Sequence, residues 1–149
     1  MSLCVVPHVY LIHCHLPHRI MKIQLKGWRV KDLVLTSKQE NSFAESSDNK
    51  FQLSFGHALD QDNPKEFIIG FKIELDEETF NIALEMAFIF ETDSIIDENF
   101  KESSFLKINA PAIAFPYIRA YVSNLTLQSG YDSVILPSIN FVSLNEKEK

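Results

Sequence analysis

Cysteine and histidine, the side chains best suited to binding a transition metal, gather in the first twenty residues of the chain. The potential ligands there are Cys4, His13, Cys14, His15 and His18. Thiolates and imidazoles at suitable spacing bind zinc. This spacing matches no closed zinc pattern, and the adjacent residues 13–15 cannot easily all point at one ion. A metal site is therefore an alternative that we do not expect.

The same segment, residues 1–20, differs in composition from the rest of the chain. It has two of the six prolines and no acidic residue. A secretory signal has a charged start and an unbroken apolar core, whereas Pro7 and the histidines interrupt this one. We expect residues 1–20 to be an unstructured leader, or a mis-annotated start with translation beginning at Met21. Residues 21–149 are expected to form a single domain.

Outside this leader, few residues could support catalysis. His57 falls on the apolar side of an alternating segment, where a buried, hydrogen-bonded histidine is commoner than a catalytic one. Asp76, Glu77 and Glu78 could hold a cation, but acidic clusters in tight turns are usually solvated. With four glycines, the chain has no glycine-rich phosphate loop, and it has no nucleophile elbow. The sequence predicts a binding protein that is not an enzyme and carries no cofactor or metal.

Composition narrows the range of partners. A net charge of −6 argues against non-specific nucleic-acid binding, which requires a basic surface. Two cysteines argue against a disulfide framework and fit a reducing, cytoplasmic compartment. No apolar run approaches the roughly 20 residues that a membrane-spanning helix needs, so we expect no stable membrane insertion.

One strong helical pattern lies at residues 109–130. Its apolar side chains recur at intervals of three and four residues: Phe115, Ile118, Val122 and Leu125. We expect Asn109 to cap the first turn, which also holds Pro111, and Gly130 to end the helix in the left-handed conformation. Pro116 lacks a backbone donor, so it should kink the helix or delay its regular part. An extended segment, residues 131–141, should follow.

Three segments alternate strictly between apolar and other side chains, which predicts β-strands with one buried face. The apolar sets are Phe51, Leu53, Phe55 and Leu59; Phe67, Ile69, Phe71, Ile73 and Leu75; and Phe80, Ile82, Leu84, Met86, Phe88 and Phe90. The joins at 60–64 and 76–78 are too short for a crossover helix, so the strands should form an antiparallel meander. Burying these fifteen side chains is worth about 2 kcal/mol each, and the helix is the expected cover.

An earlier segment, residues 23–36, is strand-like, but its apolar side changes phase twice. The successive pairs are Ile23 and Leu25, Trp28 and Val30, and Leu33 and Leu35. Each change predicts a β-bulge or twist, with Gly27 marking the first. Residues 39–49 are polar and predict a loop. The opposite face of the sheet is small and flat, and is either solvated or a docking surface.

Ordered motifs in the C-terminal part resemble those of the SecB protein-export chaperones. They are Phe115-Pro116-Tyr117-x-Arg119, then Gly130-Tyr131, then Leu136-Pro137-x-x-Asn140-Phe141. This resemblance covers residues 109–144, and a weaker one runs from Trp28-x-x-Lys31-Asp32 to Phe90.

The resemblance implies an α+β fold, in which a four-stranded antiparallel meander sheet is packed on one face by the long helix of the C-terminal half. It also implies a homotetramer, a dimer of dimers, in the bacterial cytoplasm. Such a protein holds unfolded or precursor polypeptides in apolar grooves without ATP.

Site residues are implied by the same resemblance. The polypeptide groove would use the aromatic residues Tyr117, Tyr121, Tyr131 and Phe141. Delivery to the SecA motor would use the acidic residues Asp32 and Glu85. Thr36 stands where the family often has Glu, and the usual long helix after Phe141 is cut to a few residues.

Other functions remain open. Some SecB-like proteins serve toxin–antitoxin pairs instead of general export. From different classes, the sheet and helix could enclose a pocket for a small apolar ligand, or the chain could be an assembly module without a client.

Overall fold

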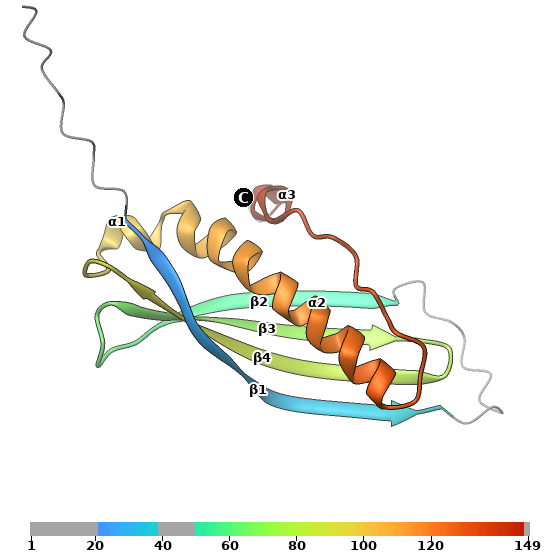
Figure 1. Ribbon diagram of the computed structural model, residues 1–149. Helices are drawn as coiled ribbons and strands as arrows, with labels where there is room; N and C mark the ends of the chain where they lie inside the picture. The colour runs from blue at the N-terminus through green and yellow to red at the C-terminus, as the bar shows by residue number, and fades with distance from the viewer. Residues whose placement is uncertain (1–20, 39–49, 148–149) are drawn as a thin grey trace, which may run out of the picture.

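The alternating segments form one antiparallel sheet, with a long helix across one of its faces (Figure 1). The computed structural model describes residues 21–38 and 50–147. The leader, its signal and metal alternatives, and the loop at 39–49 lie outside the described residues. The strands are β1 (Ile23–Ser37), β2 (Phe51–Leu59), β3 (Glu66–Asp76) and β4 (Phe80–Thr92), and the long helix is α2 (Ala110–Gln128). The predicted α+β fold is confirmed.

The strand order, β1-β4-β3-β2, refines the expected meander. β2, β3 and β4 follow one another as hairpins, but β1 pairs with β4, so β1 and β2 are the two edges of the sheet. Alternation shows which side chains share a face. It carries no information about the edge at which a separate strand joins the sheet.

Both phase changes predicted in β1 are bulges. The pairing of β1 with β4 shifts register between Leu25 and Gly27, and again between Val30 and Asp32. Each extra residue restores the alternation, so Trp28 lies opposite Phe88, and Leu33 opposite Leu84, on the helix side of the sheet. Lys26 is the extra residue of the first bulge, and its Nζ lies 3.0 Å from Glu91 Oε2. The hydrogen bond to that carboxylate raises the pKa of Lys26 above its ordinary value.

The core lies between the sheet and α2. The inward side chains of β3 and β4 are almost completely buried, and their rings contact one another across the strands. Phe67 stacks on Phe90 at 5.2 Å between centroids, and Phe71 meets Phe88 edge-on at 5.8 Å. From α2, Ala114, Ile118 and Val122 complete the core.

The start of α2 differs from the prediction that Asn109 caps it. Asn109 has helical dihedrals, and its side chain makes no capping bond. A short helix, α1 (Glu98–Lys101), and a π-helical turn, η1 (Phe105–Asn109), precede α2. The N–H of Ala110 donates to the carbonyl of Phe105 across that turn, so the N–H groups near Asn109 already have partners. The wide π-turn also makes room for Pro111, whose ring would otherwise clash with a carbonyl one turn earlier.

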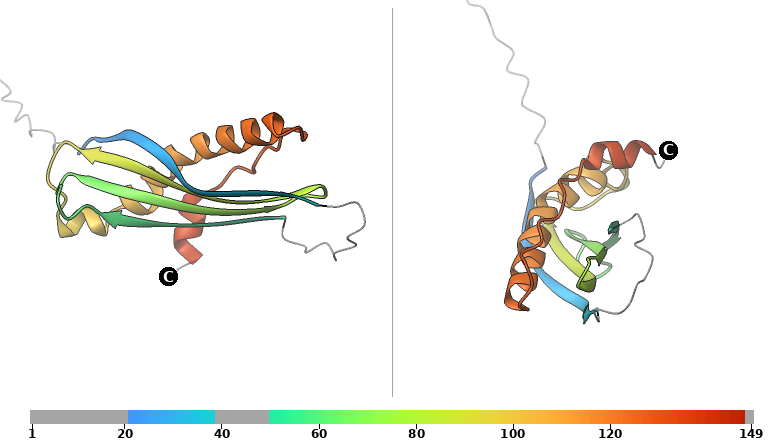
Figure 2. Two further views of the ribbon diagram at one scale, coloured as in Figure 1. Left: turned by 90° about the horizontal axis from the view of Figure 1, so that it is seen from below. Right: turned by 90° about the vertical axis from the view of Figure 1, so that its right-hand side faces the viewer.

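The end of α2 matches the prediction. Gly130 has φ of 85°, and its N–H donates to the carbonyl of Leu127 at 3.2 Å. The N–H of Tyr131 donates to the carbonyl of Thr126 at 3.1 Å, which completes a Schellman cap. An extended segment follows, and the chain forms a final short helix, α3 (Phe141–Lys147), on the β2 side of the molecule (Figure 2). Asn140 caps α3 by accepting a bond from the N–H of Val142 at 3.1 Å.

Candidate functional site

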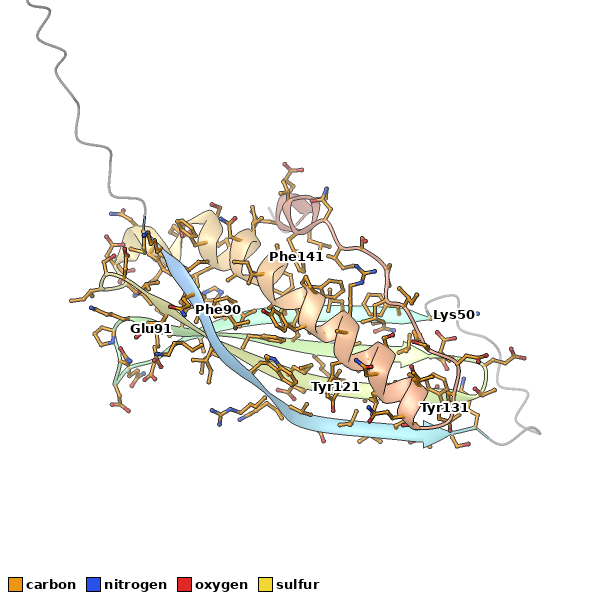
Figure 3. The ribbon with its side chains drawn as sticks, in the orientation of Figure 1. Lys50, Phe90, Glu91, Tyr121, Tyr131 and Phe141 are labelled. Carbon is orange, nitrogen blue, oxygen red and sulfur yellow. The ribbon has the colours of Figure 1, made fainter. Side chains whose placement is uncertain are left out.

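The four aromatic residues predicted to contact polypeptide do not lie on one surface, and Figure 3 labels three of them, Tyr121, Tyr131 and Phe141. Tyr117 and Tyr121 lie on α2, and their rings approach side chains of β4 and β1 respectively. Tyr131 follows the end of α2, where its ring packs on Phe80 at 4.3 Å between centroids. Phe141 lies at the start of α3, on the opposite side of α2 from Tyr121. The structure therefore separates these residues into different faces.

The first face is an aromatic patch formed by Trp28, Tyr117 and Tyr121. The rings of Trp28 and Tyr121 meet edge-on at 5.9 Å, and Phe88 lies 6.4 Å from both Trp28 and Tyr117. Trp28 is 42% exposed and Tyr117 is 46% exposed. The predicted bulge at Gly27 explains why Trp28 reaches this face.

The aromatic patch continues onto an outward face of α2 that has no charged side chain. The exposed residues of α2 are mostly apolar, and the two polar ones are uncharged: Ala112, Ile113, Pro116, Tyr117, Ala120, Asn124, Leu127 and Gln128. Arg119 is the one charged residue of α2, and its Nε donates to the carbonyl of Leu136 at 3.1 Å. Exposed apolar side chains that gather on one face are typical of interaction surfaces. This face therefore has the character of a protein–protein contact.

The extended segment 131–140 is fastened along α2 by polar contacts. Besides the bond from Arg119, the hydroxyl of Thr126 accepts a bond from the N–H of Val134 at 3.0 Å and donates to the carbonyl of Val122. The hydroxyls of Ser123 and Ser133 are 2.6 Å apart. Thr126 is fully buried, so its hydroxyl has no contact with solvent and binds the extended segment to α2.

The second face lies where the extended segment, α3 and β2 come together. Phe141 is only 4% exposed and packs against Phe55 at 5.3 Å and Phe115 at 5.8 Å between centroids. It therefore anchors α3 to the sheet from within the core and offers little surface to a ligand. Aliphatic side chains are also exposed on the extended segment and α3: Ile135, Val142 and Leu144, hereafter the aliphatic rim.

The sequence-based selection of aromatic residues missed the aliphatic rim. A signal was present, since Asp132 is the only charged residue between 130 and 145, and apolar residues recur through the rest of that stretch. Ile135 is 75% exposed and Val142 is 48% exposed, so the core does not account for them.

The open face of the sheet brings Asp32 and Glu85 together. They are direct register partners on β1 and β4, and both are exposed. Lys72 lies opposite Glu85 on β3, and its Nζ is 3.5 Å from Glu74. The acidic pair therefore has a cation beside it. Glu85 lines a shallow hollow of about 500 Å³ together with Gly56, Gly70 and Ala87.

His57 does not have the buried position that was expected. It is exposed on β2, which is an edge strand. Among the described residues, no group of three or more histidine, cysteine, aspartate or glutamate side chains is arranged to hold a metal ion. The described helices include none long and apolar enough to cross a membrane.

Comparisons with a family model and with known sequences point to the same family. The family described as preprotein translocase subunit SecB matches residues 18–149. A protein-export protein SecB of a Jannaschia species is 27% identical over 142 residues, which cover 87% of this chain and 81% of that protein. A SecB of Dinoroseobacter shibae is 32% identical over 91 residues, covering 56% of this chain and 52%, about half, of the relative.

Solved structures show the same fold. A SecB-like chaperone of Mycobacterium tuberculosis, in complex with a peptide from an antitoxin, has a TM-score of 0.58 at 14% identity, with 79% of this chain and 90% of that chain covered. A Streptococcus agalactiae protein of unknown function has a TM-score of 0.56 at 14% identity, with 79% and 98% covered. At this identity, the likeness concerns the fold alone.

Proposed function

The chain belongs to the SecB family, and from that premise we propose that it is an ATP-independent chaperone that holds unfolded polypeptides on the β2 and α3 side of the sheet. The observation that carries the proposal is the aliphatic rim, which leaves apolar side chains exposed next to a well-filled core. Exposed apolar surface attracts unfolded chains without demanding a particular sequence, because the hydrophobic effect is non-directional.

The packing of the core favours a holding role over a small-ligand carrier. Phe67, Phe71, Phe88 and Phe90 are almost completely buried and in ring contact with their neighbours. An apolar carrier needs an enclosed cavity at this position, between sheet and helix. Apolar recognition is therefore assigned to the surface.

The aromatic patch and the uncharged face of α2 suit self-association. Tryptophan and tyrosine are enriched at the centres of protein interfaces, and small side chains such as Ala112 and Ala120 let helices approach closely. We assign Tyr117 and Tyr121 to the contact between copies of this chain in a homotetramer, and Tyr131 to support of the α2 end. A sedimentation mass equal to the 17.1 kDa protomer would exclude this assembly.

Asp32 and Glu85 form the proposed docking point for the SecA motor, with precursor export as the cellular role. Their adjacency on the open face supports this role, since paired carboxylates attract a basic partner. The neighbouring Lys72 offsets part of their charge, so we expect weak, salt-sensitive docking. Reversing both charges, with Asp32→Lys and Glu85→Lys, should remove motor binding in a pull-down while leaving client binding unchanged.

Client binding at the aliphatic rim is tested by fluorescence anisotropy with a labelled, reduced and carboxymethylated polypeptide that cannot fold. The double variant Ile135→Ser, Val142→Ser should bind about tenfold more weakly, equivalent to ~1.4 kcal/mol. The matched control is Ile95→Ser, because Ile95 is also an exposed aliphatic residue but belongs to the turn after β4 and not to the extended segment or α3.

The outcomes separate the classes of function. Equal affinity of the rim variant and the control variant would contradict the proposed surface. Binding restricted to one antitoxin segment, with no affinity for the unfolded polypeptide, would favour a dedicated toxin–antitoxin role. Thermal stabilisation by a small apolar molecule, without polypeptide binding, would favour a ligand carrier.

A further inference from the structure

The two edges of the sheet differ in their protection against strand addition. β1 is interrupted by two bulges and has four charged residues, Lys26, Arg29, Lys31 and Asp32. Bulges and charges are the devices by which natural sheets prevent another strand from pairing with an edge. β2 pairs with β3 over nine consecutive residues without a register shift, and it has no Lys, Arg, Asp, Glu or Pro. β2 is therefore an unprotected edge.

The hydrogen bonds that flank β2 show which of its backbone groups face outward. The N–H of Asp76 donates to the carbonyl of Lys50 at 2.9 Å, and the N–H of Asp60 donates to the carbonyl of Glu66 at 3.3 Å. Hydrogen-bonded pairs recur at every second residue of an antiparallel ladder. The even-numbered residues from 50 to 60 therefore direct their N–H and C=O groups toward β3.

It follows that the odd-numbered residues of β2 direct their backbone groups away from the sheet. These residues are Phe51, Leu53, Phe55, His57 and Leu59. No strand in the described part of the chain pairs with that side of β2. A row of donors and acceptors, spaced two residues apart, is thus available beside the second face.

We propose that an extended segment of the client polypeptide adds to β2 as a fifth strand, through the backbone groups of these odd-numbered residues. This inference rests on the proposed function and specifies how the client is held. An added strand directs alternate side chains toward the helix face, where Phe55 is half-buried and α3 lies on the β2 side (Figure 2). Those side chains would pack with Phe55 and the exposed side chain of Val142.

The features of this edge favour a client strand over a second copy of the chain. A stable interface between folded proteins takes roughly 20–30 residues from each side, whereas this edge offers nine residues of one strand. One extended segment is enough to pair with all of it. Backbone bonds are also independent of side-chain identity, which suits a partner of variable sequence. The lack of charge on β2 fits apolar segments of the client.

A matched pair of substitutions at His57 tests the backbone contact. His57→Pro removes one outward N–H, and proline is tolerated on an edge strand when its nitrogen faces solvent. His57→Val removes the same imidazole but keeps the N–H. Because His57 is exposed, both variants should keep the Tm of the wild-type protein within a few degrees. The probe is the labelled, carboxymethylated polypeptide described above.

We expect His57→Val to bind like the wild-type protein and His57→Pro to bind about tenfold more weakly. Equal binding by all three proteins, or equal loss in both variants, would overturn the inference while leaving the proposed function intact. Failure of the wild-type protein to bind the polypeptide would instead refute the proposed function.

Amide hydrogen exchange gives a readout that does not depend on a substitution. Client binding should slow exchange at Leu53, Phe55 and His57, whose N–H groups point outward. Unchanged exchange at these amides in the bound state would overturn the inference. Protection of the same amides in the free protein, before client is added, would also overturn it, because the edge would already be occupied.

Discussion

At the scale of single residues, the hydroxyl of Thr126 has a large structural effect for its size. It is buried, and it holds the N–H of Val134 on the extended segment at 3.0 Å. A buried donor that loses its partner costs about 1–3 kcal/mol. The position of the aliphatic rim relative to α2 therefore depends on this bond and on the bond from Arg119 to Leu136.

Thr126→Val should lower the free energy of unfolding by about 1–2 kcal/mol, because the isosteric side chain leaves the N–H of Val134 without an acceptor. Thr126→Ser keeps the hydroxyl and loses a buried methyl, so it should also destabilise the protein by about 1 kcal/mol. Amide exchange separates the two causes. Val134 should lose protection in the valine variant and keep it in the serine variant, and equal protection in both would contradict the assigned role.

Prediction of single residues from the sequence succeeded where the conformation depends on the local backbone alone. Gly130 takes the left-handed position that was expected of it. Asn109 fails as a cap, because η1 supplies helical turns before it. His57 is exposed because β2 lies at an edge, and edge position depends on the pairing of distant strands.

At the scale of elements, the cap of α2 sets the direction in which the chain enters the extended segment. Gly130→Ala should destabilise the protein by about 1–2 kcal/mol, because a side chain is strained at φ of 85°. Gly70→Ala is the control, because Gly70 lies in a strand without positive φ and its added methyl would meet no atom within 4 Å.

The two glycine variants are compared by urea denaturation. The urea midpoint of Gly130→Ala should fall below that of the wild-type protein. Gly70→Ala should leave the free energy of unfolding unchanged or raise it by up to about 1 kcal/mol. Similar midpoints for both variants would show that the cap does not limit stability.

The bulges of β1 could be predicted because an apolar pattern that changes phase requires an extra residue if one face is to remain buried. The partner of β1 could not be predicted, since pairing with β4 joins residues as far apart in the sequence as Ile23 and Thr92. The aliphatic rim was missed for a related reason. The sequence does not show which apolar residues stay outside the core, because that depends on how the sheet and helices pack in three dimensions.

At the scale of the whole molecule, each surface has a different proposed role. We propose that the uncharged face of α2 and the aromatic patch contact other copies of the chain, and that the open face of the sheet docks the motor. The β2 edge with the aliphatic rim is the proposed client surface. The division follows from chemistry: an apolar helix face, a pair of carboxylates, and a strand edge beside exposed aliphatic side chains.

The most direct test of the central claim is light scattering of a chemically denatured model protein diluted into buffer with this protein and without nucleotide. The wild-type protein and Ile95→Ser should suppress aggregation at a near-stoichiometric ratio, and the Ile135→Ser, Val142→Ser variant should lose most of that effect. Aggregation that proceeds unhindered with the wild-type protein, or is suppressed equally well by the rim variant, would contradict the account.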